Sequence, residues 1–317
     1  MEYNWERSLP FLNIDLHTAN KLLKEILEDN TIENIIPINE GCRTSNYILK
    51  ITNSNKKYIL KIFPELNCDY KKENNLLKLL KDKVQVQNIY YISKSYIINN
   101  RTFALYEYIE GKTLGQAIKD GYIIDENFIK EVAKALAMIH KFKFNSIGEF
   151  NEKLEVVNKL PPLYTWYANF MDINFKNRLG QDVIDRINTI VQNNLQALIE
   201  LDKDISLVHG DFQGTNILIN NKKLAGIIDW EFSMAGHALA DIGQLFRYEN
   251  YFDENLINIF EKEYNKHSDK KLIKGWYKIA KLRDLVNLIQ LISAKEEMPN
   301  KYKEIKGIIM KTLNIFQ

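Results

Sequence analysis

The spacing of apolar residues changes part-way along this chain, and that change restricts the fold more than any other feature. Between about residues 33 and 108, apolar residues alternate with polar ones or form short runs, as in GCRTSNYILKIT (41–52) and KKYILKIF (56–63). Such runs are typical of β-strands, and the polar TNSNK between them predicts a hairpin turn. From about residue 113 onward the spacing becomes that of amphipathic helices. The sequence therefore predicts a small sheet-rich part followed by a larger, mostly helical part.

Three further elements are expected in the first part. Apolar residues at helical spacing predict one helix over about 15–29 and another over about 70–83. Two strand-like runs, SYIINN (95–100) and RTFALYEYI (101–109), predict a pair of strands around an Asn-Asn turn.

The second part contains two long helical patterns and a few short strands. The segments 125–144 and 181–201 each place apolar residues on one helical face, and short apolar runs between 205 and 230 predict a small strand cluster. The two apolar faces consist of Phe128, Ile129, Val132, Leu136 and Ile139, and of Val183, Ile187, Ile190, Val191 and Leu198.

The length of 317 residues suits one large domain or two moderate ones. The change in pattern indicates two lobes, an N-terminal sheet-rich lobe over 1–109 and a helical C-terminal lobe over 110–317. A cleft between two such lobes is a natural place for a ligand.

Composition excludes several classes of function. The formal net charge is +2 and the basic residues are spread along the chain, so nucleic acid is not expected as a partner. No apolar run approaches the roughly 18 residues of a membrane span, and the N-terminus lacks a signal-peptide core. Cys42 and Cys68 lack metal-ligand spacing, as expected of thiols in a reducing compartment. We therefore expect a cytoplasmic protein, by default a monomer, without a membrane partner.

The segment LVHGDFQGTNILI (207–219) places polar residues between two apolar, strand-like runs. Asp211 follows the first run, Asn216 opens the second, and Asp229 ends the next one. If the second and third runs pair as a hairpin across Asn220-Asn221, all three side chains converge at one end of the strand cluster. Two oxygen donors with substrate phosphates suit Mg²⁺, and the remaining carboxylate could face a reacting hydroxyl. The alternative is an ordinary polar turn, because Asp and Asn are common turn residues.

The order HGDFQGTN (209–216) followed by IIDW (227–230) resembles the catalytic and metal-binding segments of the aminoglycoside phosphotransferase and choline kinase group. The first segment has the form of the protein-kinase catalytic loop, H-x-D-x-x-x-x-N. The resemblance spans about residues 35–245. It implies an α+β, protein-kinase-like two-lobe fold, with a small sheet-rich N-terminal lobe and a large, mostly helical C-terminal lobe.

The resemblance also implies roles for residues of the C-terminal lobe. Asp211 would accept the proton of the substrate hydroxyl, or at least orient that hydroxyl. Asn216 and Asp229 would hold Mg²⁺ against the phosphates of ATP. His209 and Asp241, the latter in GHALADIG (236–243), would be structural, with Asp241 buried and bonded to loop amides.

Residues of the N-terminal lobe would bind the nucleotide. Lys61 would neutralise the α- and β-phosphates, with Glu73 as its ion-pair partner; the alternative is a surface ion pair of little energetic value. The loop NEGCRTSNY (39–47) would cover the phosphates, and the hinge-like segment ALYEYIEG (104–111) would present backbone groups to adenine. The candidates in these two segments are Gly41, Ser45 and Asn46, and then Glu107, Tyr108 and Ile109.

Some features depart from protein kinases. The loop over the phosphates has a single glycine, Asp229 is followed by Trp-Glu rather than Phe-Gly, and no A-P-E segment or activation loop follows. A kinase acting on Ser or Thr of proteins is therefore disfavoured.

His140 ends the apolar face of its helix and is expected to be a packing residue.

The sequence thus predicts an enzyme that transfers the γ-phosphoryl group of ATP, with Mg²⁺, to a hydroxyl of a small molecule, for example an aminoglycoside or another antibiotic. GTP stays open as the donor. Alternatives are a kinase of a small metabolite alcohol of the choline, homoserine or methylthioribose type, and a non-catalytic nucleotide-binding or spore-coat-type protein. No excess of acidic residues in the helical part selects a polycationic antibiotic as substrate.

Overall fold

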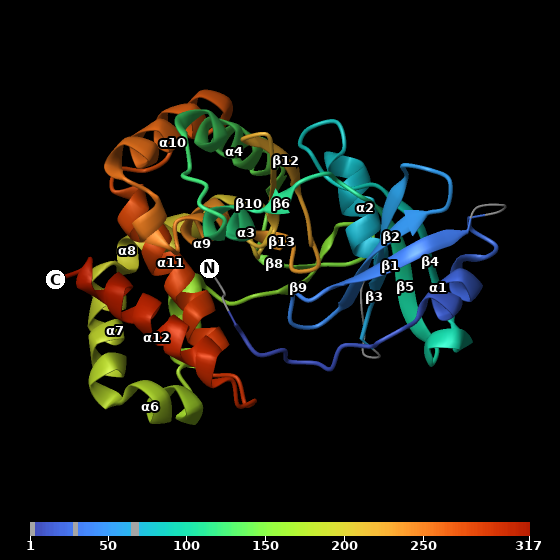
Figure 1. Ribbon diagram of the computed structural model, residues 1–317. Coiled ribbons are helices and arrows are strands. Elements are labelled where there is room, and N and C mark those ends of the chain that lie inside the picture. Colours follow the sequence, from blue (N-terminus) through green and yellow to red (C-terminus); the bar gives the residue numbers. More distant parts are fainter. Residues whose placement is uncertain (1–3, 28–30, 65–69) are drawn as a thin grey trace.

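The computed structural model describes residues 4–27, 31–64 and 70–317 of the chain, which form a sheet-rich region and a mostly helical region (Figure 1). Among the described residues, five strands form an antiparallel sheet in the order β1-β2-β3-β5-β4. These strands are β1 (Ile32–Ile38), β2 (Ser45–Ile51), β3 (Lys57–Ile62), β4 (Ile89–Ser95) and β5 (Arg101–Glu107).

The two faces of this sheet belong to different cores. Phe103 and Leu105 of β5 pack with the helix α1 (Leu16–Leu23), whereas Ala104 and Tyr106 face the helix α2 (Tyr70–Leu80). This division follows from the alternation of side chains along a strand. The core on the α2 side continues into the helical region, so α2 and the inner sheet face are packed against the larger lobe.

The helical region contains a second and a third sheet among the described residues. One has the order β7-β10-β13-β8-β9 and the other the order β12-β11-β6. Their strands are β6 (Lys112–Thr113), β7 (Lys143–Phe144), β8 (Gly148–Phe150), β9 (Val156–Lys159), β10 (Ile205–Val208), β11 (Ile217–Asn220), β12 (Lys223–Ile227) and β13 (Met234–His237).

Helices surround these short strands (Figure 1). Helix α4 pairs with α10, and the largely buried α11 lies between α9 and α12. The helices are α3 (Leu114–Lys119), α4 (Glu126–Ile139), α5 (Leu163–Phe170), α6 (Ile173–Leu179), α7 (Gln181–Asn193), α8 (Leu195–Leu201), α9 (Ala238–Leu245), α10 (Glu254–His267), α11 (Trp276–Ile292) and α12 (Pro299–Asn314). No helix of the described part has the length and apolar character that crossing a membrane requires.

Helices α9 and α11 approach each other unusually closely at Gly243. A Cβ atom at this position would lie 2.2 Å from the backbone oxygen of Ala280, so only glycine allows the contact. This contact matters because α9 lies directly behind the loop that carries Asp211, as shown below.

The first residues of the described chain connect the two regions. Glu6 accepts a 2.9 Å hydrogen bond from the backbone nitrogen of Asn300 at the start of α12, while Arg7 Nη2 donates to the carbonyl of Thr44 at 2.7 Å. Figure 1 shows this blue segment running from beside α12 to the sheet-rich lobe. This connection was not predicted, because the segment lacks helical or strand periodicity.

Several predicted elements are confirmed. The runs 41–52 and 56–63 form the hairpin β2–β3, the pattern at 70–83 is α2, and the pattern at 125–144 is α4 with its predicted apolar face buried. The runs that begin at 216 and 223 pair as the hairpin β11–β12, although its tight turn lies at Asn221 and Lys222, which both have positive φ.

Other predicted elements need correction. The helix expected over 15–29 ends at Leu23, and its last predicted residues lie partly outside the described chain. The strand expected at 95–100 is instead β4, ending at Ser95, followed by a 3-10 turn at Tyr96–Ile98. The single helix expected over 181–201 is broken at Asn194, whose side chain bonds the carbonyl of Ile190 at 2.8 Å and so competes with the helical pattern. Of the five-stranded sheet in the helical region, β10 was predicted, whereas β7, β8, β9 and β13 were missed because strands of two to four residues are too short to show a period.

Candidate active site

The loop between β10 and β11 is held from behind by the start of α9. Asp241 is fully buried and accepts hydrogen bonds from the backbone nitrogens of His209, at 2.8 Å, and Gly210, at 3.0 Å. His140 Nε2 lies 3.2 Å from the same carboxylate. The sequence predicted Asp241 as a buried residue that bonds loop amides, and the contacts have that form. They fix the backbone just before Asp211.

Gly210 is the position at which this loop meets the segment after Asp229. It has a φ of +82°, and a Cβ atom there would lie 2.3 Å from the carbonyl oxygen of Phe232. Both observations require glycine, because left-handed backbone and close approach to another carbonyl exclude ordinary side chains. The contact sets the spacing between the loops that carry Asp211 and Asp229.

The carboxylate of Asp211 is bonded at both oxygens. Asn216 Nδ2 donates to Oδ2 at 2.7 Å, and Gln213 Nε2 donates to Oδ1 at 2.9 Å. Asn216 Nδ2 also donates to the backbone oxygen of Asp211 at 2.8 Å. Because the nitrogen of the Asn216 amide faces Asp211, its oxygen is the atom that could meet a cation.

Asp229 lies beside Asn216, as the hairpin prediction required. The backbone nitrogen of Ile228 donates to the carbonyl of Asn216 at 3.0 Å, across the ends of β11 and β12. Asp229 itself has a φ of +65°, an uncommon conformation for a residue other than glycine. This backbone turn coincides with the placement of its side chain against Lys61 from the other lobe.

Lys61 binds Asp229 more closely than it binds Glu73. Its Nζ lies 2.8 Å from Asp229 Oδ1 and 4.0 Å from Glu73 Oε2. Lys61 and Glu73 are both buried, so the alternative of a surface ion pair is wrong. The structure therefore brings together Lys61, Glu73 and Asp229, and adds a contact between lobes that the sequence did not predict.

Burial and neighbouring charges shift the pKa values of the carboxyl groups at this site in opposite directions. Burial disfavours the charge on Asp229, but the ammonium of Lys61 outweighs it and lowers the pKa of Asp229. Burial also opposes the charge on Lys61, yet Asp229 and Glu73 raise the pKa of Lys61 well above its ordinary value. For Asp211, burial prevails over His209 and Arg247 and raises the pKa of that carboxyl. Burial and then Asp229 raise the pKa of Glu231 to about 7.

The donor set suits a magnesium ion shared with phosphates better than a metal site built from protein alone. Among the described residues, no cluster of three or more His, Cys, Asp or Glu side chains is arranged to hold a metal. Asn216 and Asp229 offer one amide oxygen and one carboxylate at adjacent strand ends. Mg²⁺ in nucleotide sites commonly uses one or two protein ligands, with phosphates and waters completing its octahedron.

The residues predicted to contact phosphates separate into two groups. Asn46 pairs with Lys61 across β2 and β3 and thus shares its face of the sheet, and its Oδ1 is a buried polar atom without a partner in the described chain. Ser45 lies on the opposite face, where its hydroxyl accepts a 2.8 Å bond from the backbone nitrogen of Leu12. Its side chain is therefore not brought to Lys61, contrary to the prediction. Gly41 is exposed, with its carbonyl bonded by Arg7.

The predicted hinge follows β5 directly. The backbone nitrogen of Glu107 donates to Asn88 at 2.8 Å, and its carbonyl accepts from Gln87 at 2.8 Å. Both backbone groups of Glu107 are thus already bonded within the protein. Tyr108 and Ile109 are partly buried next to it, and Lys57 Nζ lies 4.8 Å from the centre of the Tyr108 ring.

Sequence reasoning missed several residues at this site. Gln213 bonds Asp211 from within the motif, Arg247, just after α9, bonds Gln213, and Glu231 lies two residues after Asp229. The signal for Gln213 was its place inside HGDFQGTN, where only the Asp and Asn were considered. His209 was predicted to be structural. Its Nε2 donates to the carbonyl of Ile228 at 3.0 Å, and its Nδ1 accepts from Asp211 N at 3.2 Å.

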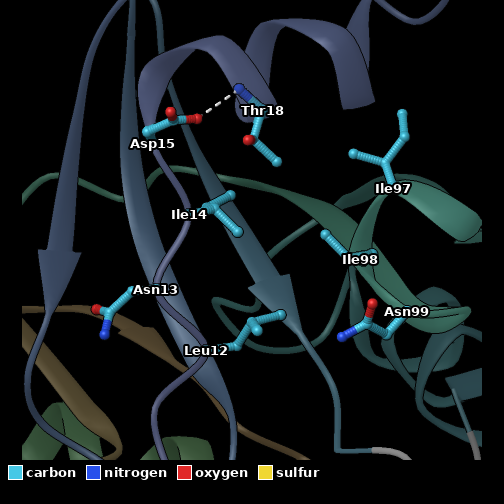
Figure 2. Close-up of a pocket in the computed structure, with 8 residues that line it drawn as sticks. All are labelled: Leu12, Asn13, Ile14, Asp15, Thr18, Ile97, Ile98 and Asn99. Atoms are coloured by element: carbon cyan, nitrogen blue, oxygen red, sulfur yellow. Dashed lines mark hydrogen bonds between the residues drawn. The ribbon is translucent and has the colours of Figure 1, made fainter.

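A surface pocket elsewhere contains none of these residues. It lies between the N-terminal segment, α1 and the turn after β4 (Figure 2), and it is lined by Leu12, Asn13, Ile14, Asp15, Thr18, Ile97, Ile98 and Asn99. Asp15 there accepts a 2.8 Å bond from Thr18 N, as an ordinary helix cap.

Comparison with known proteins finds similarity over the part of the chain that contains these residues. A model of the phosphotransferase enzyme family matches residues 34–277, more than half of the chain.

Two curated relatives are both named acyl-CoA dehydrogenase family member 11. The one from Rattus norvegicus is 25% identical over 159 residues, covering 49% of this chain and 20% of the relative. The one from Mus musculus is 36% identical over 116 residues, covering 36% and 14%. The chain thus spans about a fifth or less of these relatives.

Solved structures share the fold over almost the whole chain. A ternary complex of aminoglycoside phosphotransferase APH(4)-Ia with AMP-PNP and hygromycin B has a TM-score of 0.70 at 15% identity, covering 94% of this chain and 98% of that one. A GDP complex of aminoglycoside 2'-phosphotransferase-IIIa has a TM-score of 0.72 at 16% identity, covering 96% and 99%. Choline kinase LicA from Streptococcus pneumoniae has a TM-score of 0.65 at 19% identity, covering 94% and 98%. These likenesses confirm the predicted α+β kinase-like fold.

Proposed function

The chain belongs to the phosphotransferase enzyme family, and on that premise we propose that it transfers the γ-phosphoryl group of ATP, with Mg²⁺, to a hydroxyl of a small molecule. The observation that carries the proposal is one continuous set of contacts. Lys61 bonds Asp229 at 2.8 Å, Asp229 adjoins Asn216 across the β11–β12 hairpin, and Asn216 bonds Asp211 at 2.7 Å. The ammonium of Lys61, the two oxygen donors and the carboxylate of Asp211 thus lie next to one another in a single row of contacts.

Each residue of the row has a part in the reaction we propose. Asp211 orients the acceptor hydroxyl and takes its proton as the acceptor oxygen bonds to the γ-phosphorus and the bond from that phosphorus to ADP breaks. Lys61 binds the α- and β-phosphates, with Glu73 beside it, and Asn216 and Asp229 would hold the metal. When bound, Mg²⁺ supplies positive charge that stabilises the transferring phosphoryl group.

We propose further that residues 1–109 form the nucleotide-binding lobe and residues 110–317 the lobe with the substrate site. Asn46 and Gly41 would lie near the phosphates, and the backbone of Tyr108 and Ile109 near adenine. We favour ATP as the phosphoryl donor because of the family resemblance. GTP is the alternative donor, since one related structure contains GDP. We also propose a cytoplasmic location, on the expectation from the sequence, and a monomer by default.

The acceptor belongs to a class rather than a single compound. The related structures include an enzyme crystallised with hygromycin B and a choline kinase, so an aminoglycoside or other antibiotic and a small metabolite alcohol are both candidates. The chain has no acidic excess that selects the first.

A panel experiment tests the function. Melting temperature is measured with Mg-ATP, with Mg-GTP, and with Mg-ATP plus aminoglycosides, choline, homoserine or methylthioribose, and acceptors that stabilise the protein enter an ADP-release assay. We expect Mg-nucleotide to raise the melting temperature and at least one alcohol to stimulate ADP release. Stabilisation by nucleotide without any turnover would favour the non-catalytic alternative, and no stabilisation at all would contradict the proposal.

A further inference from the structure

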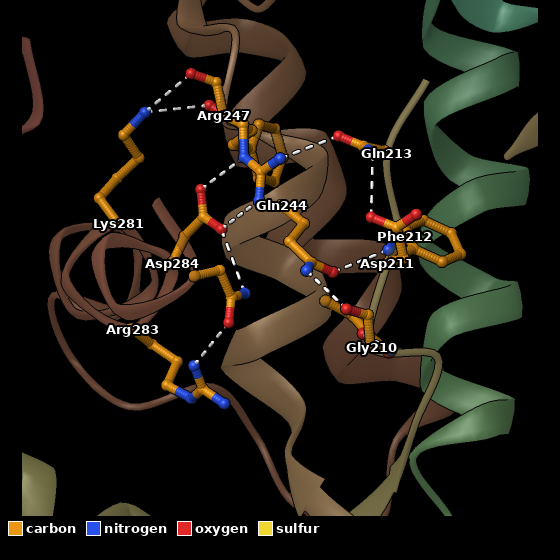
Figure 3. Close-up of polar contacts among 12 residues, drawn as sticks. Gly210, Asp211, Phe212, Gln213, Gln244, Arg247, Lys281, Arg283 and Asp284 are labelled. Carbon is orange, nitrogen blue, oxygen red and sulfur yellow. Dashed lines mark hydrogen bonds and ion pairs between the residues drawn. The ribbon is translucent and has the colours of Figure 1, made fainter. Parts of the chain in front are cut away.

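A buried chain of polar contacts leads from Asp211 to α11 (Figure 3). Gln213 Nε2 donates to Asp211 Oδ1 at 2.9 Å, and Gln213 Oε1 accepts from Arg247 Nη1 at 2.9 Å. Arg247 in turn grips Asp284 through both of its remaining nitrogens, Nε to Oδ2 at 2.9 Å and Nη2 to Oδ1 at 2.7 Å. Gln213, Arg247 and Asp284 are all at least 94% buried, with exposed fractions of 6%, 3% and 1%.

The guanidinium determines which way round the Gln213 amide lies. Arginine can only donate hydrogen bonds, so the carbonyl of Gln213 must face Arg247 and its NH₂ must face Asp211. A flipped amide would place an oxygen against the Asp211 carboxylate and a nitrogen against the guanidinium, and both contacts would be repulsive. Arg247 thereby ensures that a donor, rather than an acceptor, points at Asp211.

A neighbouring residue of α9 holds the backbone on both sides of Asp211. Gln244 Oε1 accepts from the nitrogen of Phe212 at 2.7 Å, and Gln244 Nε2 donates to the carbonyl of Gly210 at 2.8 Å. Arg247 lies two residues past the end of α9, and its backbone nitrogen donates to the carbonyl of Gln244 at 3.2 Å. One fixes the main chain around Asp211 and the other, through Gln213, its side chain.

Helix α11 fixes Arg247 at two points. Asp284 binds its guanidinium, and Lys281 Nζ donates to the carbonyls of Phe246 and Arg247, each at 3.2 Å. A buried ion pair is weak evidence of stabilisation, because desolvation of two charges commonly cancels their attraction. The geometry of this pair is better explained by a role in orienting what Arg247 touches.

We propose that Arg247 is a positioning residue which, held by Asp284, fixes the Asp211 carboxylate through Gln213. With Gln213 on Oδ1 and Asn216 on Oδ2, the carboxylate cannot rotate away from the acceptor hydroxyl. The inference rests on the proposed function of Asp211, and it adds a requirement that no residue of the motif itself supplies. The contact between α9 and α11 at Gly243 becomes part of the catalytic arrangement.

The kinetic test removes both members of the ion pair together. In R247M/D284L neither charge is left alone in the core, and replacing a buried ion pair by apolar residues of similar size is commonly tolerated. With an acceptor found by the panel, we expect kcat to fall on the order of 10- to 100-fold, since small misplacement of a reacting group has effects of that size. The KM for Mg-ATP should change less than about twofold, because the nucleotide residues are untouched. Unchanged kcat would overturn the proposal.

Two further variants separate positioning from a general loss of stability. Tyr167→Phe removes a buried 2.9 Å bond to the carbonyl of Leu282 on the same helix, without contacting the Asp211 loop, and should leave kcat unchanged. Arg247→Lys keeps the charge but not the planar fork, so it should recover only part of kcat. Equal loss of kcat in Tyr167→Phe and R247M/D284L would contradict a specific role of Arg247.

A spectroscopic test does not depend on turnover. In protein labelled with ¹⁵N-glutamine, the side-chain NH₂ signal of Gln213, assigned by its loss in Gln213→Ala, should show two well-separated, slowly exchanging protons. In R247M/D284L we expect these protons to exchange faster and their shifts to converge, while the other glutamine signals stay in place. An unchanged Gln213 signal would overturn the inference even in an active enzyme. If the wild type shows these two separate, slowly exchanging Gln213 protons but has no activity, the proposed function is contradicted instead.

Discussion

Lys61 and Asp229 belong to different lobes, lie 168 residues apart in the sequence, and share a 2.8 Å hydrogen bond between Nζ and Oδ1. The nearest oxygen of Glu73 is at 4.0 Å, so the lysine is bound chiefly to the proposed metal ligand. Binding of Mg-nucleotide would exchange this contact for two others, Lys61 with phosphates and Asp229 with the cation. On the proposed function, we therefore expect the site to bind the metal complex of the nucleotide better than the nucleotide alone.

Removing the lysine should weaken nucleotide binding. In Lys61→Met the carboxylates of Glu73 and Asp229 lose their shared cation, and phosphates would meet uncompensated negative charge. We expect the Kd for Mg-ATP, measured by calorimetry, to rise by about tenfold or more, as for loss of one charge-assisted contact. Lys21→Met, at an exposed position of α1 on the opposite side of the sheet, is the control and should bind normally. Equal affinity in the two variants would contradict the assignment of Lys61.

Removal of magnesium should weaken ATP binding in the wild type much more than in Asp229→Asn. Without the metal, the ionised Asp229 carboxylate repels the phosphates, and the variant lacks that charge. The measurement is ATP affinity with Mg²⁺ and with EDTA, and Asp120→Asn serves as a surface control. If the ratio of the two affinities is the same in Asp229→Asn as in the wild type, Asp229 is not a metal ligand.

Gly210→Ala should reduce both stability and activity. The new Cβ would lie 2.3 Å from the carbonyl of Phe232, so the loops carrying Asp211 and Asp229 must separate. We expect a loss of about 1–3 kcal/mol in the free energy of unfolding, typical of backbone strain, and a lower kcat. Gly121→Ala is a close control, because Gly121 has a similar φ of +95° but no atom within 4 Å of the added Cβ. It should lose stability without losing kcat, and a matching loss of kcat would rule out the steric explanation.

We expect the buried His237 to make the protein less stable in mild acid. Its Nδ1 accepts from Arg283 Nε at 3.2 Å and its Nε2 donates to Asp202 at 2.9 Å, so the neutral ring fits this place. Burial outweighs the hydrogen bond to Asp202 and, together with the charge of Arg283, lowers the pKa of His237. Below the ordinary histidine pKa of about 6.5 the unfolded chain therefore binds a proton that the folded protein does not.

The free energy of unfolding should accordingly decrease as pH falls through 6.5, and denaturant titrations between pH 5 and pH 8 measure that slope. His237→Gln should flatten this slope, and His17→Gln, at an exposed position of α1, serves as the control. A slope that is equally steep in His237→Gln would show that other groups cause it.

Local patterns predicted the parts of the structure that local chemistry controls. The β11–β12 hairpin brought Asn216 and Asp229 together because both residues flank strands that pair through a tight turn. The lobes were visible in the change from strand to helix spacing. Lys61 could be placed on its strand from the sequence, but its partner could not, because a contact over 168 residues depends on how the lobes pack.

The unpredicted features share that dependence on packing. Ser45 and Asn46 are neighbours in one segment, and only the pairing of β2 with β3 shows that Asn46 alone shares a face with Lys61. Gln213 lies inside HGDFQGTN, but its contact with Arg247 could not be predicted, because it requires α9 to lie behind the loop. The short strands β8, β9 and β13 gain their pairing from neighbours rather than from their own periodicity.

The most direct test of the central claim compares wild type with Asp211→Asn in an assay of acceptor-dependent ADP release. The amide keeps the size of the carboxylate but cannot take the proton of the hydroxyl. We predict a fall in kcat of about 100-fold or more, in the range typical of a lost general base, with Mg-ATP binding retained. Phosphorylation of the same acceptor at the wild-type rate by Asp211→Asn would contradict the account.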